Sequence, residues 1–133
     1  MVRYLLDTNI ASDMIRNPWG RPARRHSVLG RASASVSIIV AAELRFGATK
    51  KMNPDLTSRV EEFLDTVEVI SFDPPADAFY AMVRADLEAR GQRIGSNDLF
   101  IAAHALALDR ILVTNNDRDF GGVNGLVVEN WLR

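Results

Sequence analysis

Three carboxylates occupy positions where a purely structural sequence would favour apolar residues. Asp7 follows a short apolar run, Glu43 lies within an apolar helical segment, and Asp98 opens another. Carboxylates that share one pocket repel each other unless a proton or a cation relieves the repulsion. The chain has no cysteine and two histidines, so its metal ligands would be mainly oxygen atoms, which favours Mg²⁺ or Mn²⁺ over zinc. Such a site can neutralise a phosphate and activate water, and it therefore predicts phosphodiester hydrolysis.

Glu43 is the most informative of the three acids. It shares one helical face with the residues one turn before and after it, which are Ile39, Val40, Phe46 and Gly47. We therefore expect its side chain to point into the protein, where a carboxylate is costly unless it is paired or bound to a metal. An internal salt bridge to an arginine is the structural alternative.

Asp7 and Asp98 each have an ordinary structural interpretation as well. Asp7 ends the first predicted strand, at the edge of the sheet where ligand crevices form, but aspartate is also a favoured helix N-cap. Thr8 and Asn9 can cap that helix instead. Asp98 lies in the first turn of a helix, where its charge complements the helix dipole.

A fourth group of polar residues follows the predicted strand 111–114. This group consists of Asn115, Asn116, Asp117 and Asp119. It again lies at the carboxyl end of a strand, but the same residue types are common in turns for local reasons. Both interpretations remain open.

Predicted strands alternate with predicted helices along the whole chain. The strands are expected at 2–6, 35–37, 67–72, 111–114 and 126–128. The helices are expected at 8–16, 21–30, 39–51, 53–65, 74–91 and 96–108, with Ser96 as the cap of the last one. This alternation predicts an α/β fold with a parallel sheet covered on both faces, in a single domain of residues 1–133.

The composition limits the possible classes of protein. Of the 133 residues, 47% are hydrophobic and 25% are charged, as in ordinary globular proteins. The lack of cysteine excludes disulfide frameworks, zinc–thiolate sites and thiol catalysis. No apolar run approaches the roughly 18 residues that cross a membrane, and the N-terminal run is too short for a signal peptide. We expect a soluble, cytoplasmic protein with no membrane contact.

The net charge of −1 conceals local clusters of basic residues. One cluster contains Arg16, Arg21, Arg24, Arg25, His26 and Arg31, and a second contains Arg45, Lys50 and Lys51. These side chains either contact phosphates or form a solvated helical surface, and the sequence favours neither. Trp19, beside the first cluster, is interpretable as a core residue, a dimer contact or a base-stacking platform. His104, in an alanine-rich helix, is expected in the core or an interface.

Four segments together resemble the motifs of a known family. They are LLDTN at 5–9, AELRFGA at 42–48, NDLFIAAHAL at 97–106 and LVTNNDRDF at 112–120. Their order and spacing are similar to those of PIN-domain ribonucleases, and most of all to the VapC-type toxins of bacterial toxin–antitoxin pairs. The resemblance implies a PIN-like three-layer α/β/α sandwich with a mainly parallel sheet, and cleavage of RNA with Mg²⁺ or, in its place, Mn²⁺.

The resemblance also implies roles for individual residues. Asp7, Glu43 and Asp98 match the acidic positions of the family and are expected as catalytic metal ligands. Thr8 and Thr114 match positions where a hydroxyl supports the ligands, and Asn9 is expected to assist.

The fourth motif departs from the family pattern. Many members have an aspartate where this chain has Asn116. Its amide oxygen can bind the metal ion or a metal-bound water but adds no charge, and Asn116 is expected to assist the three acids in catalysis. Asp117 or Asp119 can replace it with a poorer fit of spacing, so Asp117 is also expected in the supporting shell. One metal ion is accordingly better supported than two.

The partners that the resemblance implies are RNA and protein. A VapB-type antitoxin is expected to lay its C-terminal segment across the groove and to place an arginine near the acids. A homodimer is expected within a larger toxin–antitoxin assembly, which contacts operator DNA only through the antitoxin. Gly91, the segment 98–105 and the VTNN at 113–116 resemble members that cleave the anticodon loop of initiator tRNA, which is therefore the expected substrate.

Two other functions are weighed against this one. A catalytically silent PIN-like module that binds RNA or protein would not require Glu43 on an apolar face. A phosphoacceptor domain with Asp7 as the acceptor would need acids where the chain has other residues, such as Asn9 two positions later.

Overall fold

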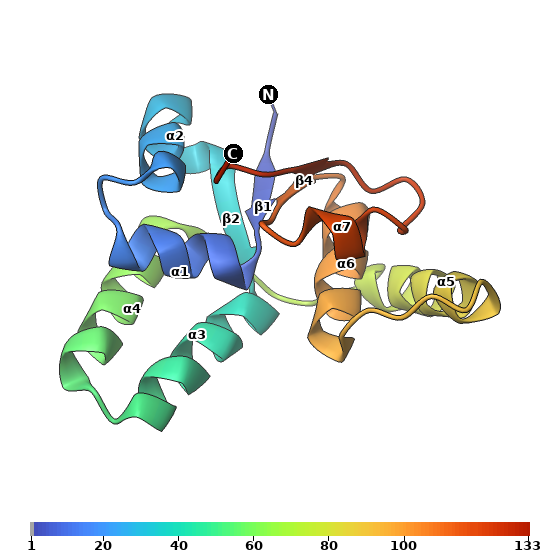
Figure 1. Cartoon of the computed structure of the whole chain (residues 1–133), viewed down its shortest axis with the longest axis horizontal. Helices are drawn as coiled ribbons and strands as arrows, with labels where there is room; N and C mark the ends of the chain where they lie inside the picture. Colours follow the sequence, from blue (N-terminus) through green and yellow to red (C-terminus); the bar gives the residue numbers. More distant parts are fainter. Residues whose placement is uncertain (1) are drawn as a thin grey trace.

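A five-stranded sheet whose strands all run parallel forms the centre of the computed structural model, which describes residues 2–133 (Figure 1). Met1, the first residue of the predicted domain, lies outside this range. The strands are β1 (Tyr4–Leu6), β2 (Ala34–Ser37), β3 (Glu68–Ile70), β4 (Ile111–Val113) and β5 (Val128–Glu129). The helices are α1 (Thr8–Arg16), α2 (Arg21–Leu29), α3 (Ile38–Lys51), α4 (Pro54–Thr66), α5 (Ala76–Ala89), α6 (Ser96–Leu108) and α7 (Asp117–Phe120), with a short 3₁₀ helix η1 (Arg31–Ser33).

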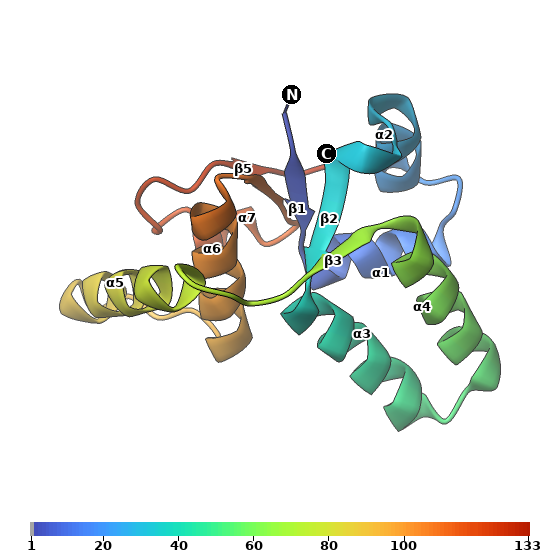
Figure 2. The ribbon, with the colours of Figure 1, turned by 180° about the vertical axis from the view of Figure 1, so that it is seen from behind.

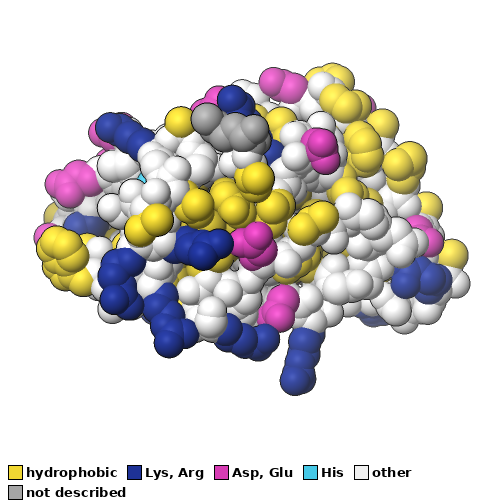
Figure 3. Space-filling view, turned by 90° about the horizontal axis from the view of Figure 1, so that it is seen from above, with side chains coloured by type: hydrophobic (Ala, Val, Ile, Leu, Met, Phe, Trp, Pro, Cys, Tyr) yellow, Lys and Arg dark blue, Asp and Glu magenta, His cyan; other side chains and the backbone are white. Residues whose placement is uncertain are grey.

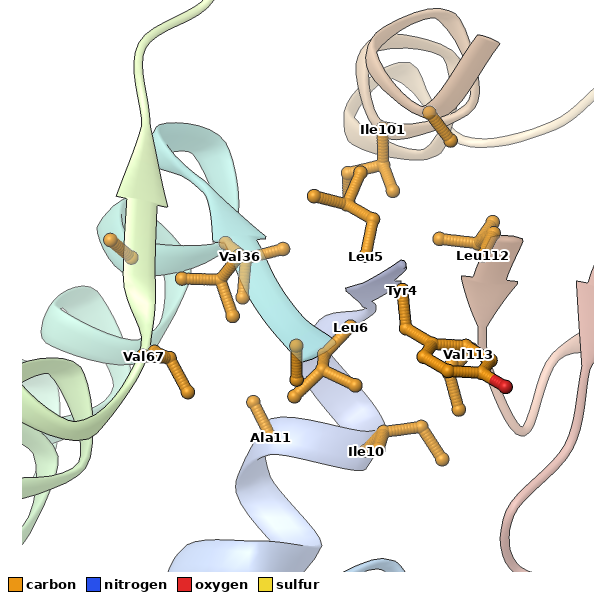
Figure 4. Close-up of a cluster of buried hydrophobic side chains, with 14 of the residues drawn as sticks. Tyr4, Leu5, Leu6, Ile10, Ala11, Val36, Val67, Ile101, Leu112 and Val113 are labelled. Carbon is orange, nitrogen blue, oxygen red and sulfur yellow. The ribbon is translucent and has the colours of Figure 1, made fainter. Parts of the chain in front are cut away.

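Helices cover both sides of this sheet. Figures 1 and 2 show α1, α3 and α4 gathered on one side and α5 and α6 on the other. The close-up of the core shows how β1 serves both layers, with Leu5 toward Ile101 of α6 and Leu6 toward Ile10 and Ala11 of α1 (Figure 4). Successive residues of a strand point to opposite faces, so a central strand covered on both faces must be apolar throughout. The predicted three-layer α/β/α fold is confirmed, and the sheet is parallel throughout rather than mainly parallel.

The strand order creates a switch point beside β1. The sheet has the order β3-β2-β1-β4-β5, so the chain first builds outward from β1 on one side and then returns to build outward on the other. Ligand crevices in open α/β sheets form at the carboxyl ends of strands at such a point. Leu6 of β1 is opposite Val113 of β4, and the backbone N–H of Asp7 donates to the Val113 carbonyl at 2.8 Å. Asp7 and Thr114 therefore emerge side by side at this edge.

The predicted elements agree with the structure except at some ends. Ser96 is the first residue of α6 rather than its cap, and Gly95 holds the N-cap position without a side-chain hydrogen bond. The last strand was predicted at 126–128 but is Val128–Glu129, because the turn that precedes it continues to Leu126, whose N–H donates to the Val123 carbonyl. The short helix α7 was not expected, since its polar sequence is typical of a turn.

No helix within residues 2–133 has the length and apolar character that a membrane crossing requires.

Candidate active site

Asp7 is held in place by hydrogen bonds to three neighbours at the end of β1. Its Oδ1 accepts the backbone N–H of Thr8 at 2.8 Å, and its Oδ2 accepts the Thr114 hydroxyl at 2.7 Å and the Asn9 amide at 3.4 Å. The residue is 4% exposed. Asp7 is itself the N-cap of α1, so the expectation that Thr8 or Asn9 would cap this helix was wrong. One carboxylate therefore caps the helix and faces the candidate site.

The surroundings of Asp7 act on its pKa in both directions. Burial raises the pKa, the hydrogen bonds from Thr114 and Thr8 lower it, and the negative charge of Glu43 raises it again, with a net upward shift. Burial and a like charge both oppose ionisation, and a nearby cation would reverse this effect.

Glu43 reaches the same site from α3. Its Oε1 accepts the Thr8 hydroxyl at 3.0 Å, so Thr8 joins Glu43 to Asp7 through its own hydroxyl and N–H. The expectation that Glu43 is a buried carboxylate was wrong: the residue is half-buried, and Phe46 on the same face is 65% exposed. The buried face of α3 is a different one, formed by Val40, Ala41, Leu44 and Ala48. No salt bridge engages Glu43 within residues 2–133.

Asp98 completes the group from the first turn of α6. It is half-buried, and its pKa is raised to about 6 by burial and then by the negative charges of Asp7, Glu43 and Asp119. Charges shift the pKa of another group appreciably only when they are close to it. The structure therefore brings together the three acids that the sequence singled out, from β1, α3 and α6.

The polar residues of the fourth motif point in two directions, some toward the three acids and one toward the C-terminus. The Asn116 N–H donates to the Thr114 hydroxyl at 2.9 Å, and its side-chain amide donates to Asp119 at 2.8 Å. Asp119 is the acid of this motif that acts on Asp98. Asp117 is turned away toward the C-terminus, where it accepts from Arg133 at 3.1 Å and from Asn130 at 3.4 Å.

Asn9 links the two central strand ends a second time. Its Oδ1 accepts the backbone N–H of Asn115 at 3.1 Å, while its amide faces Asp7. The loop after β4 is thus tied to the start of α1 independently of the Thr114 bond.

The oxygen atoms of this site suit a hard divalent cation, although the three carboxylates are farther apart than the ligands of one bound metal ion. Within residues 2–133, no three acidic or histidine side chains converge closely enough to hold a metal ion in their present positions. Asp7 is fixed by its hydrogen bonds, whereas Glu43 and Asp98 are half-buried and reach the solvent at the same site. Oxygen ligands and mutual repulsion that a cation would relieve are what Mg²⁺ and Mn²⁺ sites require.

His104 is a core residue, as expected, and lies outside this group. It is 1% exposed, its Nδ1 is 2.8 Å from the Ser37 hydroxyl, and its ring packs edge-on against Phe72. Burial lowers its pKa, with the charge of Arg110 acting in the same direction. The ring is therefore neutral and acts in packing rather than in proton transfer.

Comparison with known proteins gives one consistent result. The family model described as "PIN domain" matches residues 4–126. The chain is 39% identical to "Ribonuclease VapC2" of Haemophilus influenzae over 99% of this chain and 100% of that protein. It is 35% identical to the "tRNA(fMet)-specific endonuclease VapC" of Shigella flexneri over 98% of this chain and 99% of that one. A similar fold occurs in the crystal structure of VapBC2 from Rickettsia felis bound to a DNA fragment from their promoter, with a TM-score of 0.91, 36% identity and coverage of 98% of this chain and 99% of that one.

Proposed function

Because the chain belongs to the PIN-domain family and, within it, to the VapC ribonucleases, we propose that it is a divalent-metal-dependent endoribonuclease toxin that cleaves tRNA. The single observation that supports the metal dependence is the grouping of Asp7, Glu43 and Asp98 at the switch point of the sheet, where the charge of Glu43 raises the pKa of Asp7 and the charges of Asp7 and Glu43 raise that of Asp98. Carboxylates arranged in this way favour a bound Mg²⁺ or Mn²⁺.

Asp7, Glu43 and Asp98 would hold the cation, and neighbouring residues hydrogen-bond to Asp7 and to Glu43 in different ways. The Thr8 N–H and the Thr114 hydroxyl favour the ionised form of Asp7. The Thr8 hydroxyl orients Glu43. A bound divalent cation would neutralise charge on the scissile phosphate and make water a better nucleophile.

Asn116 and Asp119 border the site formed by the three acids. Asn116 donates its amide hydrogen to Asp119, which leaves the amide oxygen as an acceptor for a water or a ribose hydroxyl. Asp117 is assigned a structural role with Arg133 rather than one in the supporting shell.

The proposed substrate is initiator tRNA, cleaved in the anticodon loop. The support is the substrate printed in the name of the Shigella relative, together with nearly complete coverage of both chains. A toxin that acts on tRNA works in the cytoplasm, and we propose that location.

The experiment that tests this function incubates the purified protein with initiator and elongator methionine tRNA, in Mg²⁺, Mn²⁺ or EDTA, and maps the RNA ends. We expect cleavage of the initiator only, with either metal and not in EDTA. Asp7→Asn and Glu43→Gln should lose cleavage, while Glu62→Gln, an exposed acid on α4, should keep it. Full activity of Asp7→Asn, or activity in EDTA, would contradict the proposal.

The antitoxin partner is proposed to lie on α3. Its support is the VapBC complexes in which the matching fold occurs and a hollow of about 150 Å³ beside Glu43, with the exposed ring of Phe46 nearby on the same helix. An antitoxin segment in this hollow would also block the acids. We further propose a homodimer within a larger assembly that reaches operator DNA through the antitoxin.

Co-expression with a VapB-type antitoxin tests the partner proposal. Phe46→Glu should weaken the complex, whereas Met82→Glu on the exposed face of α5 should not. Equal co-purification of both variants would exclude α3 as the docking surface, and light scattering of the toxin alone would give its oligomeric state.

A further inference from the structure

The exposed face of α2 carries arginines that the proposed reaction does not use. Arg21, Arg24 and Arg25 are spaced by three and four residues, so they project from one side of the helix. Pro22 is buried and Ala23 packs against the core on the other side. Figure 3 looks down on the end of the molecule that bears α2 and the C-terminus and shows several Lys and Arg side chains gathered there.

The positions of these arginines near the N-terminus of α2 lower the stability of the helix. The first turn of α2 has no acidic residue, and its N-cap Gly20 provides no side-chain hydrogen bond. Arginines near a helix N-terminus oppose the helix dipole, and like charges one turn apart repel. A bound anion would relieve both effects.

The acids nearby neutralise this charge only in part. Glu129 lies 3.9 Å from Arg25 and also accepts the indole N–H of Trp131, and Asp117 pairs with Arg133. Within residues 2–133, no ion pair engages Arg16, Arg21 or Arg24. Asp13 lines a hollow next to Arg16 and Arg21, but it is buried and accepts a hydrogen bond from the side-chain amide of Asn17.

Three hollows connect this surface to the acids. The hollow beside Glu43 includes Arg16, a second hollow of about 500 Å³ includes both Arg16 and Arg21, and a third of about 580 Å³ runs from Arg21 to Arg133. Arg16 and Arg21 each line two of these hollows, so neighbouring hollows meet at these two side chains. Asp13 and Arg16 of α1 line the middle hollow, so this hollow begins about 9–14 Å along the helix axis from Asp7.

Trp19 adds an aromatic surface to the same path. It lines the middle hollow and is 87% exposed, which excludes the core as its location. Exposed aromatic rings beside a line of positive charge are what proteins use to bind single-stranded nucleic acid, since bases stack on the ring while the charges follow the backbone.

We propose that Arg16, Trp19, Arg21, Arg24, Arg25 and Arg133 form an arginine track, along which an unpaired strand of the RNA substrate binds on its way to or from the acids. This inference rests on the proposed ribonuclease function and extends it to the position of the flanking nucleotides. An acidic protein segment is the other class of ligand that such charges could bind, and the exposed Trp19 favours RNA.

The test measures binding of a fluorescently labelled, short single-stranded RNA by anisotropy in EDTA, so that no cleavage is needed. Arg21→Gln/Arg24→Gln should weaken binding about tenfold at low salt and reduce the slope of log Kd against log salt by about 1.4, at about 0.7 for each lost phosphate contact. Trp19→Ala should weaken binding by about fivefold or more.

The control removes the same charge from another surface. Arg84→Gln/Arg93→Gln changes exposed arginines on and after α5 and should bind RNA like the unchanged protein. Unaltered affinity and slope in Arg21→Gln/Arg24→Gln, or an equal loss in the control, would overturn the track. A wild-type protein that binds RNA through these arginines but cleaves none with Mg²⁺ or Mn²⁺ would refute the proposed function and leave the track standing.

Discussion

The hydroxyl of Thr114 donates to the carboxylate of Asp7 at 2.7 Å and joins the carboxyl ends of the two central strands. The same hydroxyl oxygen accepts the N–H of Asn116 at 2.9 Å. A residue buried at the end of β4 thus orients both the first acid and the start of the fourth motif.

Replacement of Thr114 by valine keeps the shape of the side chain and removes both hydrogen bonds. We expect a loss of about 1–3 kcal/mol in unfolding free energy, as for a buried polar group left without its partner. The pKa of Asp7 should rise further, because the bond from Thr114 lowers it, so cleavage should begin at higher pH. Urea unfolding and a pH–rate profile measure the two effects. Thr114→Ser, which keeps the hydroxyl, should retain the original profile, and identical profiles for serine and valine would contradict this role.

Asp98 should make the fold less stable as the pH rises. Its pKa is about 6 against an ordinary value of 3.8, so between these values the folded chain holds a proton that the unfolded chain has released. Stability therefore falls as the pH rises through this range, and the penalty is complete above the folded pKa. Because the group is half-exposed, solvent screening reduces the effect to on the order of 1 kcal/mol.

Asp98→Asn isolates this effect by removing the charge. In EDTA its Tm should exceed that of the unchanged protein at about pH 7.5 and approach it at about pH 3, below the ordinary pKa, where Asp98 is largely protonated in both states. Glu62→Gln, which removes an exposed carboxylate from α4, serves as the control for the loss of a charge. A constant difference in Tm across the pH range would indicate a packing effect rather than relief of repulsion.

Divalent cations should stabilise the folded protein through the same acids. A ligand that binds only the folded state at about one hundred times its Kd adds about 2.7 kcal/mol, and Mn²⁺ should raise the Tm relative to EDTA accordingly. Asp7→Asn should lose this increase while remaining folded, since an amide can still cap α1. A shift of the same size in Asp7→Asn would place the cation elsewhere.

The layers of the fold could be predicted because β1 and β4 are apolar on both faces and the helices carry clear boundaries. Asp7 was identifiable for the same reason, since it ends a buried strand. The depth of Glu43 was predicted wrongly. Helical spacing groups Glu43 with Phe46 but does not say which face α1 and α4 cover, and they cover the face of Val40 and Leu44.

The choice between Asp117 and Asp119 could not be made from the sequence. It depends on α7, a single turn whose polar residues do not distinguish a helix from a loop. Residues two apart on a helix point in nearly opposite directions, and here Asp117 faces Arg133 while Asp119 accepts from Asn116 and acts on Asp98.

Asp119 and Asp117 should therefore differ when each is changed to asparagine. Asp119→Asn removes a negative charge that raises the pKa of Asp98, so this pKa should fall, and Mn²⁺ should bind several-fold more weakly because the site has lost charge. Asp117→Asn should leave both unchanged. Carboxyl chemical shifts in a pH titration and Mn²⁺-dependent Tm values provide the measurements, and a larger effect from Asp117→Asn would reverse the assignment.

The hydroxyl of Ser37 connects the start of α3, the helix that carries Glu43, to His104 in the core. Its Oγ accepts the N–H of Ile39 at 3.1 Å as the N-cap of α3, and it lies 2.8 Å from Nδ1 of the buried His104. Ser37→Ala should cost about 1 kcal/mol for the cap and about 1–3 kcal/mol for the unpaired imidazole nitrogen. Ser58→Ala, at an exposed position of α4, is the matched control for the loss of a hydroxyl. Because His104 is neutral and transfers no proton, the pH–rate profile of Ser37→Ala should keep its shape even where the rate falls. A displaced profile in this variant would make His104 part of the reaction.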